Sequence, residues 1–281
     1  GLRLFDRLVA FLPRYAGAAS KIAPLLNLRD RIPGLAGLSE ALLGFSSKRK
    51  LPVWSSNPFR LDETGSENAG GPEVVLWADT FSTYFEPENA RAAAKVLGAA
   101  GYRVHLAKSV VGNRPLCCGR TFLAAGLVDE AKAEARRMLD ALRPFVERGV
   151  PVVGLEPSCL FTLRDEFKVI LPGPETEALA DRAQLFEEYL AAEDKAGRLE
   201  LSLKPAPWTR ALLHGHCHQK AFDAMGAVEH TLGLVPGLRV ETVDSGCCGM
   251  AGAFGVGAKN YAISMTMGEP DLLPAGRGAG E

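Results

Sequence analysis

Short strand-like runs alternate with longer segments of helical periodicity from residue 73 onward. We expect strands over residues 74–78, 103–106, 150–155, 211–214 and 238–243. Between them apolar residues recur at helical spacing, and we expect helices over residues 87–100, 129–143, 179–190, 223–234 and 258–267. Strands that alternate with helices are typical of layered folds with a mainly parallel sheet, so the pattern predicts an α/β class.

The first 72 residues show a different pattern. Residues 1–45 contain apolar residues at helical spacing, which Pro13, Pro24 and Pro33 divide into short pieces. Residues 46–72 are polar and rich in Ser, Gly and Pro. We therefore expect a helical connector and linker over residues 1–72. The start has no initiator Met and is a poor signal peptide, which indicates a piece of a longer chain.

The sequence also contains an internal repeat. In residues 73–205 a strand, a helix and a second strand precede Cys117-Cys118-Gly119, and in residues 206–281 the same order precedes Cys247-Cys248-Gly249. Repeats of this kind indicate similar structural units. We expect two similar half-domains with these boundaries, both with mainly parallel sheets and related by a pseudo-twofold.

Composition narrows the class of protein. The 281 residues are 47% hydrophobic and 23% charged, and 32 Lys and Arg against 33 Asp and Glu give a formal net charge of −1. This balance argues against a general nucleic-acid binder, which needs a basic surface to neutralise phosphates. No apolar run approaches the roughly 18–20 residues of a membrane-spanning helix. We expect a cytoplasmic protein, or one bound peripherally at the inner face of the membrane.

Six cysteines carry the candidate chemistry: Cys117, Cys118, Cys159, Cys217, Cys247 and Cys248. The two adjacent pairs each precede a predicted helix, at the edge where α/β sheets bind ligands, and Cys159 stands at a similar turn. Gly119 and Gly249 allow the backbone to approach a cluster closely. Neighbouring thiolates diverge, so a pair favours a multinuclear metal centre over a single ion. Inert buried thiols, a vicinal disulfide and a structural zinc are the alternatives.

Three of the five histidines surround Cys217 in the segment 214–220. If this segment is extended, His214, His216 and His218 share one face and Cys217 lies on the other. Cys217 is then a metal ligand, and His216 and His218 support the centre as hydrogen-bond donors or proton carriers. In the zinc alternative one of these two histidines becomes a co-ligand. His214 is expected to be an ordinary strand residue.

Three phrases carry a family resemblance: Gly-Leu-Glu-Pro-Ser-Cys at 154–159, His-Gly-His-Cys-His-Gln-Lys at 214–220 and Asp-Ser-Gly-Cys-Cys-Gly-Met-Ala-Gly at 244–252. Together with the first Cys-Cys-Gly, they resemble the cysteine-rich CCG domain. That domain occurs in the iron–sulfur subunit of glycolate oxidase, the small subunit of anaerobic glycerol-3-phosphate dehydrogenase and the B subunit of heterodisulfide reductase. The likeness is strongest to the C-terminal iron–sulfur part of FAD-linked D-lactate and other D-2-hydroxyacid dehydrogenases.

The resemblance implies an iron–sulfur cluster of the 4Fe–4S type, non-cubane in the fullest family members, held by the six cysteines. This chain departs from the family in two ways. Asp79 and Thr80 stand where the family has its leading Cys, and each copy offers three cysteines instead of five, which favours a shared or reduced cluster. We expect Asp79 to cap the helical turn that follows it.

The function implied is an iron–sulfur electron-transfer module of a flavin-linked D-2-hydroxyacid dehydrogenase of the lactate or glycolate type. The expected partners are an FAD-binding dehydrogenase module, a ferredoxin-like iron–sulfur module and a quinone or protein electron acceptor. No glycine-rich dinucleotide fingerprint follows a strand in this chain, so FAD belongs to a partner module, and no residue is assigned a catalytic role. The alternative is a zinc-stabilised, non-catalytic interaction domain that binds the flavoprotein.

Overall fold

The computed structural model describes residues 1–60, 68, 70–110 and 114–279. The chain forms two compact units. The larger unit consists of Ala10–Ala23 and Trp54–Leu201, and the smaller unit consists of Gly1–Val9, Pro24–Val53 and Ser202–Glu281. Both units combine helices with parallel strands, which confirms the predicted α/β class. The pseudo-twofold and the boundaries of the half-domains stay predictions.

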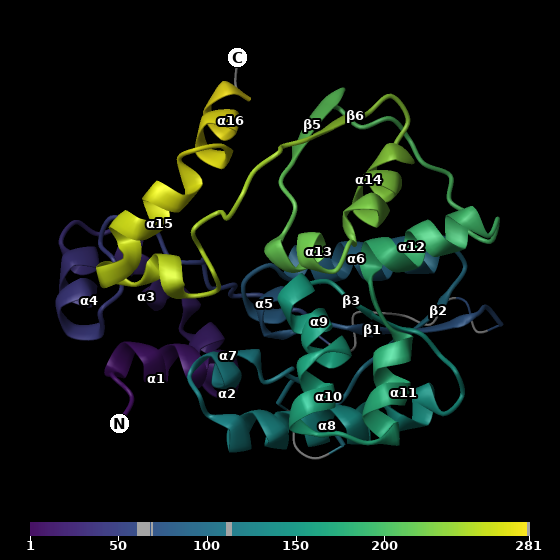
Figure 1. The fold of residues 1–281 in the computed structure, drawn as a ribbon, viewed down its shortest axis with the longest axis horizontal. Coiled ribbons are helices and arrows are strands. Elements are labelled where there is room, and N and C mark those ends of the chain that lie inside the picture. The colour runs from purple at the N-terminus through teal and green to yellow at the C-terminus, as the bar shows by residue number, and fades with distance from the viewer. Residues whose placement is uncertain (61–67, 69, 111–113, 280–281) are drawn as a thin grey trace. The chain divides into compact units, whose positions relative to one another are not determined.

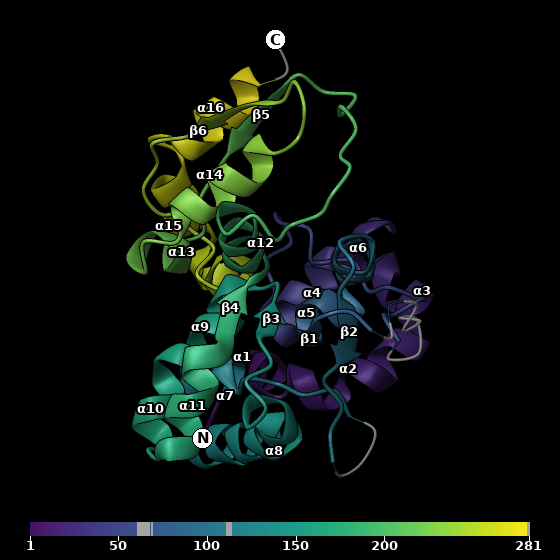
Figure 2. The same ribbon diagram turned by 90° about the vertical axis from the view of Figure 1, so that its right-hand side faces the viewer.

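The larger unit is built on a four-stranded parallel sheet. The strands are β1 (Glu73–Trp77), β2 (Arg103–Leu106), β3 (Val152–Gly154) and β4 (Ala183–Leu185). They lie in the order β2, β1, β3, β4, which Figure 2 shows from right to left. The first three confirm the predicted strands. β4 corrects the prediction of one helix over residues 179–190, because α11 (Pro174–Arg182) and α12 (Phe186–Lys195) flank it.

Helices cover both faces of this sheet (Figure 1). One face carries α12 and α6 (Pro87–Ala99), and the other carries α11, α8 (Val128–Val146) and α9 (Pro157–Arg164). The four apolar residues of β1 are all buried, as expected for a central parallel strand that packs on both sides. Val74 and Leu76 of this strand share a core with Leu97 of α6 and Leu190 of α12.

Short elements complete the larger unit around one edge of the sheet. They are α2 (Leu12–Lys21), α5 (Thr80–Tyr84), α7 (Arg120–Ala124) and α10 (Glu166–Ile170). Phe11, directly before α2, packs its ring against Phe122 of α7 with 5.3 Å between the ring centroids. The Thr121 hydroxyl donates to the carbonyl of Ala10 at 2.9 Å. These contacts hold the start of α2 beside α7.

Part of the predicted linker lies against the larger unit. The backbone N–H groups of Ser55 and Phe59 donate to the carbonyls of Tyr84 at 2.8 Å and Thr83 at 2.9 Å. The Phe59 side chain is buried in the same core as β1. The described residues of 46–72 include no helix or strand. Positions 61–67 and 69 of that predicted linker lie outside the described residues.

The smaller unit contains a two-stranded parallel sheet. β5 (Arg210–Leu213) pairs with β6 (Arg239–Thr242), close to the predicted positions. A parallel pair needs a crossover connection, and α14 (Met225–Gly233) lies in this connection, beside β6 (Figure 1). The remaining helices of this C-terminal segment are α13 (Cys217–Ala221), α15 (Tyr261–Gly268) and α16 (Leu272–Gly278), with short 3₁₀ turns at Phe254–Val256 and Ala258–Asn260.

The predicted short helical pieces near the N-terminus are present. Besides α2, they are α1 (Leu4–Ala10), α3 (Ala23–Leu26) and α4 (Leu35–Leu43), with a 3₁₀ turn at Asn27–Asp30. Pro13 and Pro24 each occupy the first turn of a helix, where the missing N–H costs no hydrogen bond. These prolines therefore start helices as well as separating them. None of the helices in the described parts of the chain is long and apolar enough to cross a membrane.

Candidate metal centre

Three of the six cysteines line one cavity in the larger unit. Cys117 and Cys118 belong to the loop that leads from β2 to α7, and Cys159 lies in the first turn of α9. They are 5%, 1% and 4% exposed, respectively. The cavity has a volume of about 10 Å³, room for about one water molecule. Its other lining residues are Pro13, Asp79, Thr80, Phe81, Arg120 and Thr121.

The parallel sheet explains why Cys159 reaches this cavity. β1 and β3 are parallel neighbours, so both end at the edge where α/β sheets place ligand sites. Glu156 follows β3 and caps α9. Its carboxylate accepts hydrogen bonds from the backbone N–H of Cys159 and from the Ser158 hydroxyl, both at 2.6 Å. This cap fixes the first turn of α9 and with it the position of Cys159.

The three thiols of the larger unit are held in their protonated form. The hydrogen bond with Cys118, followed by burial, places the pKa of Cys117 well above its usual value, and burial does the same to the pKa of Cys118. The hydrogen bond with Cys118 lowers the pKa of Cys159. Burial and the nearby carboxylates of Glu156 and Asp79 raise that pKa by more, so it also lies well above its usual value. A bound cation would remove this cost, because thiols lose their protons when they bind metal.

Asp79 caps α5, as predicted. Its Oδ1 accepts the backbone N–H groups of Phe81 at 2.7 Å and Ser82 at 3.1 Å, and its Oδ2 accepts the Ser82 hydroxyl at 2.7 Å. Burial, and after it the charge of Glu156, raises the pKa of Asp79 from 3.8 to about 6. Both carboxylate oxygens of Asp79 accept hydrogen bonds at the start of α5. Where the family has its leading Cys, this chain therefore has a residue that caps a helix.

Gly119 shapes the turn that carries the first cysteine pair. Its φ of +79° is left-handed, a conformation that favours glycine. A Cβ at this position would come within 3.0 Å of the Cα of Ala131 in α8, and the Gly119 N–H donates to the Cys117 sulfur at 3.3 Å. The backbone at Gly119 therefore approaches α8 closely, as glycine allows. That Gly119 also lets the backbone approach a cluster stays a prediction.

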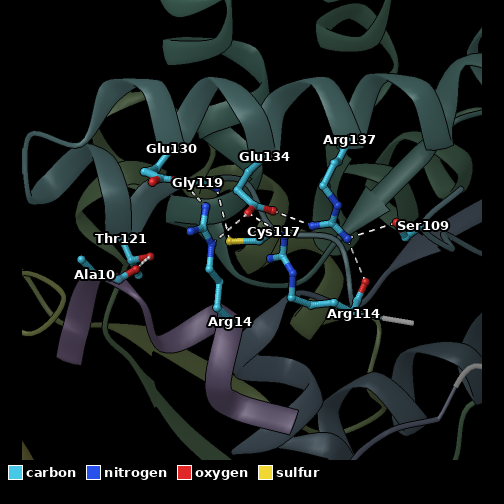
Figure 3. A network of polar contacts seen from close by, with 10 residues as sticks. All are labelled: Ala10, Arg14, Ser109, Arg114, Cys117, Gly119, Thr121, Glu130, Glu134 and Arg137. Atoms are coloured by element: carbon cyan, nitrogen blue, oxygen red, sulfur yellow. Dashed lines mark hydrogen bonds and ion pairs between the residues drawn. The ribbon is translucent and has the colours of Figure 1, made fainter. Parts of the chain in front are cut away.

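An ion-pair network that the sequence analysis misses lies beside Cys117 (Figure 3). Glu134 of α8 is 1% exposed, and its carboxylate accepts hydrogen bonds from Arg114 at 2.7 Å and Arg137 at 2.6 Å. The Nε atom of Arg14 lies 3.9 Å from the same carboxylate. One signal in the sequence points to this network. Glu134 falls on the apolar face of the predicted helix, and a carboxylate buried there needs charged partners.

The other three cysteines come together in the smaller unit. Cys217 begins α13 after β5, and Cys247 and Cys248 follow β6, the parallel neighbour of β5. Burial, followed by the Cys247 and Cys248 thiols, raises the pKa of Cys217, which hydrogen-bonds with Cys247. Cys217 is exposed and the other two are half-buried, so this group is far more open than the group in the larger unit.

The histidines do not lie on an extended segment, which corrects the prediction. The chain turns into α13 directly after β5, and His216 caps this helix by accepting the backbone N–H of His218 at its Nδ1, at 3.1 Å. The two imidazole rings lie 5.4 Å apart between centroids. His214, directly after β5, places its Nδ1 2.8 Å from the Ser245 hydroxyl. The roles of His216 and His218 toward a metal stay predictions.

Gly249 repeats the local design of Gly119. Its φ is +76°, and its N–H donates to the Cys247 sulfur at 3.4 Å. A Cβ there would overlap the carbonyl of Ser264 in α15. The two Cys-Cys-Gly turns thus share two features. In each, the N–H of a left-handed glycine donates to the first sulfur of the pair, and the α-carbon of that glycine packs closely against a later helix. This similarity of the two turns matches the predicted repeat.

The donor set of each group fits a thiolate-bound cofactor. Each offers three thiols and a backbone N–H directed at one sulfur, and cysteine thiolates with hydrogen bonds to their sulfurs are the usual environment of iron–sulfur clusters. The cavity in the larger unit has room for about one water, so its thiols must move apart to hold a cluster. In the described part of the chain no three His, Cys, Asp or Glu side chains are arranged to hold a single metal ion.

Comparison with protein families and curated proteins supports the resemblance. Residues 79–164 match the model of the cysteine-rich domain family CCG, which covers the first Cys-Cys-Gly copy. The chain is 30% identical over 259 residues to the C subunit of anaerobic glycerol-3-phosphate dehydrogenase from Escherichia coli (strain K12). It is 26% identical over 278 residues to D-2-hydroxyglutarate dehydrogenase of the same organism, and 25% identical over 205 residues to lactate utilization protein A 2 of Bacillus cereus.

These relatives differ in how much of them the chain spans. The first alignment covers 90% of this chain and 63% of the glycerol-3-phosphate dehydrogenase protein. The second covers 93% of this chain and 26% of the hydroxyglutarate dehydrogenase, and the third covers 69% of this chain and 78% of the lactate utilization protein. The chain thus spans less than two thirds of the first two relatives. No solved structure matches it.

Proposed function

Because this chain carries a cysteine-rich CCG domain, we propose that it is the iron–sulfur electron-transfer module of a flavin-linked dehydrogenase of small 2-hydroxy acids. In this role it accepts electrons from FAD on a partner module and passes them to a quinone or a protein acceptor. Similarity to part of a glycerol-3-phosphate dehydrogenase, to a D-2-hydroxyglutarate dehydrogenase and to a lactate utilization protein supports a dehydrogenase setting.

The observation that carries the proposal is the group of three buried thiols on one cavity at the edge of the larger sheet. Buried cysteines in contact are costly to ionise, and each would have to give up its proton to a cation. Cys117, Cys118 and Cys159 would hold the centre there, and Cys217, Cys247 and Cys248 would hold iron in the smaller unit. An iron–sulfur cluster supplies one-electron transfer at a potential set by charge, hydrogen bonds and burial.

The chain's own residues prepare both groups for this role. Gly119 and Gly249 direct N–H groups at the sulfurs of Cys117 and Cys247, at 3.3 and 3.4 Å. Such donors favour the ionised form of a thiol. Burial of the first group keeps bulk solvent away from its sulfurs. The exposure of Cys217 in the second group leaves an approach open for a redox partner.

The partners follow from the same proposal. An FAD-binding dehydrogenase module supplies the electrons, and a ferredoxin-like iron–sulfur module accompanies the chain, fused or separate. A quinone or a redox protein accepts the electrons. We place the protein in the cytoplasm or peripherally at the inner face of the membrane.

The test is metal analysis of the chain purified without oxygen and reconstituted with iron and sulfide. We expect iron and acid-labile sulfide in similar amounts, a brown colour and an electron paramagnetic resonance signal after reduction. The iron and sulfide content of the Cys118→Ser variant is measured in parallel with that of the wild type. Zinc at one ion per chain with no uptake of iron would contradict the proposal and support a zinc-stabilised interaction domain.

A further inference from the structure

The ion-pair network around Glu134 holds more positive than negative charge. Arg14, Arg114 and Arg137 surround Glu134, and Arg14 also pairs with Glu130. Three guanidinium groups against two carboxylates leave an excess of one positive charge. Glu134 is almost fully buried, and burial weakens solvent screening of the charges around it.

The network is rigid as well as charged. Arg137 donates to Glu134 at 2.6 Å, to the Ser109 hydroxyl at 3.1 Å and to the backbone carbonyl of Arg114 at 2.9 Å. Arg114 donates its Nη2 to the Glu134 carboxylate at 2.7 Å. Both the backbone and the side chain of Arg114 are therefore fixed.

One donor in this network is unused. The Nη1 atom of Arg114 is buried and has no hydrogen-bond partner within the described residues. A buried guanidinium nitrogen without an acceptor costs free energy, so such an atom calls for an explanation. In the view of Figure 3 the Cys117 sulfur is drawn between the guanidinium groups of Arg14 and Arg114, and the charge of Glu134, which Arg114 contacts at 2.7 Å, acts on this thiol. A neutral thiol is a weak acceptor, whereas a thiolate is a strong one for a charged donor.

We propose that Arg114 is a positioning residue for Cys117: its unused Nη1 donor serves the sulfur of Cys117 when that sulfur binds metal, and its charge raises the reduction potential of the centre. Glu134 opposes this effect and sets its size, since it neutralises part of the positive charge. The inference rests on the proposed function only for its effect on an iron centre.

The sign of the effect follows from charge. Reduction adds negative charge to the centre, and a nearby positive charge favours the more negative state. Removing the charge of Arg114 therefore lowers the potential, and removing the charge of Glu134 raises it. If the network were purely structural, removing the charge of Arg114 and removing the charge of Glu134 would not shift the potential in opposite directions.

The experiment measures the midpoint potential of the reconstituted full chain by redox titration followed by electron paramagnetic resonance. For Arg114→Gln we expect about a tenfold loss of preference for the reduced form, which equals about 59 mV for one electron. Its affinity for iron should fall by about 10- to 100-fold, as is typical when a group that supports a ligand is removed. Arg114→Lys keeps the charge and should recover most of the potential, and Glu134→Gln should shift it upward.

The control is Arg143→Gln, which removes an arginine from the same helix as Glu134. Arg143 is half-exposed and pairs with Asp140 and Glu175, so this variant should leave the potential unchanged. Thermal melts identify variants that fail to fold. A wild-type potential in Arg114→Gln, or shifts of the same sign in Arg114→Gln and Glu134→Gln, would overturn the inference.

A second measurement separates this inference from the proposed function. If the wild type binds no iron, the proposed function fails, and the metal-free chain then tests Arg114 directly. Calorimetric titration with Cd²⁺, a cation that cysteine sulfur binds well, gives the affinity of the metal-free wild type, Arg114→Gln and Arg143→Gln. Arg114→Gln should bind Cd²⁺ about 10- to 100-fold more weakly, as when a group that supports a ligand is removed, and Arg143→Gln should match the wild type. Equal affinities of the wild type and Arg114→Gln would reject the role of Arg114.

Discussion

The side chains around the cavity of the larger unit differ in whether they can bind a metal by losing a proton. Cys117, Cys118 and Cys159 have protons to lose, and their buried sulfurs have few other partners. Asp79 and Glu156 already use carboxylate oxygens as caps of α5 and α9. The thiols are therefore the exchangeable groups, and the carboxylates hold the backbone on which one of these thiols stands.

Substitution of a single thiol tests this division. Cys118→Ser should lower the affinity of the larger unit for iron by more than about 100-fold, since even the loss of a group that supports a ligand costs about 10- to 100-fold. Thr80→Ser is the matched control: it also changes a buried residue of the cavity wall but removes no thiol. Iron per chain after anaerobic reconstitution is the measurement. Equal iron content in the two variants would show that Cys118 is an inert core residue.

The raised pKa of Asp79 predicts a dependence of stability on pH in the metal-free chain. Its pKa is about 6 in the folded state and 3.8 in the reference state, mainly because of burial. Ionisation is therefore harder in the folded protein. The free energy of unfolding should fall as the pH rises from about 4 to about 6, by about 3 kcal/mol through this one group, and stay level above that.

Asp79→Asn isolates this effect. The amide keeps an oxygen that can accept the N–H groups of Phe81 and Ser82 but carries no charge. Urea unfolding of both proteins between pH 4 and pH 7 gives the difference in free energy, in which other titrating groups cancel. The variant should gain stability relative to the wild type across this range. A difference that does not change with pH would show that the Asp79 pKa is close to its usual value.

At the scale of helices and strands, elements with a clear periodicity are predictable from the sequence. The run Glu-Val-Val-Leu-Trp of β1 and the apolar face of α6 are examples, since each reflects burial that the local pattern encodes. β4 has only three residues, Ala-Gln-Leu, and an alternation this short does not distinguish it from the helices on either side. It is a strand because its backbone pairs with β3, which is a tertiary contact.

The site is predictable to a similar degree. The cysteines and their turns follow from the spacing of the Cys-Cys-Gly motifs and the strands before them, and the structure brings them together in two groups of three. Arg137 lies three residues from Glu134 in α8, but Arg14 and Arg114 come from other segments of the chain, 20 or more residues away. No periodicity links Glu134 to these two positions. The cap at His216 has no clear signal for a local reason, because a helix of five residues leaves little pattern in the sequence.

The two Cys-Cys-Gly turns lead to a prediction about their glycines. In Gly119→Ala the left-handed backbone costs about 1–2 kcal/mol, and contact with α8 adds about 1–3 kcal/mol, as for an overpacked core. Gly126 at the other end of α7 is the control. Its φ is +74° and a Cβ there meets nothing within 4 Å, so Gly126→Ala should lose only the backbone part. Chemical denaturation measures both, and equal losses would contradict the close approach of Gly119 to α8.

At the scale of the whole molecule, the chain corresponds to part of the enzymes it resembles. It covers 26% of the D-2-hydroxyglutarate dehydrogenase and 63% of the anaerobic glycerol-3-phosphate dehydrogenase protein. A dehydrogenase needs a group that takes hydride from its substrate, which in our proposal is the flavin of a partner module. Electron transfer and substrate oxidation should therefore be separable in this system.

This separation gives the last prediction. The reconstituted, flavin-free chain should not reduce a redox dye with D-lactate, glycolate, D-2-hydroxyglutarate or glycerol 3-phosphate, because none of its assigned residues accepts hydride. The same preparation should bleach within seconds of mixing with photoreduced FAD, since electrons then reach the thiolate-bound iron directly. The control is Cys118→Ser, whose lower iron content should reduce the amplitude of bleaching in proportion. Substrate-dependent dye reduction by the flavin-free chain would show that it is a dehydrogenase by itself. Full iron content without any bleaching by reduced FAD would mean that the metal does not serve electron transfer from a flavin.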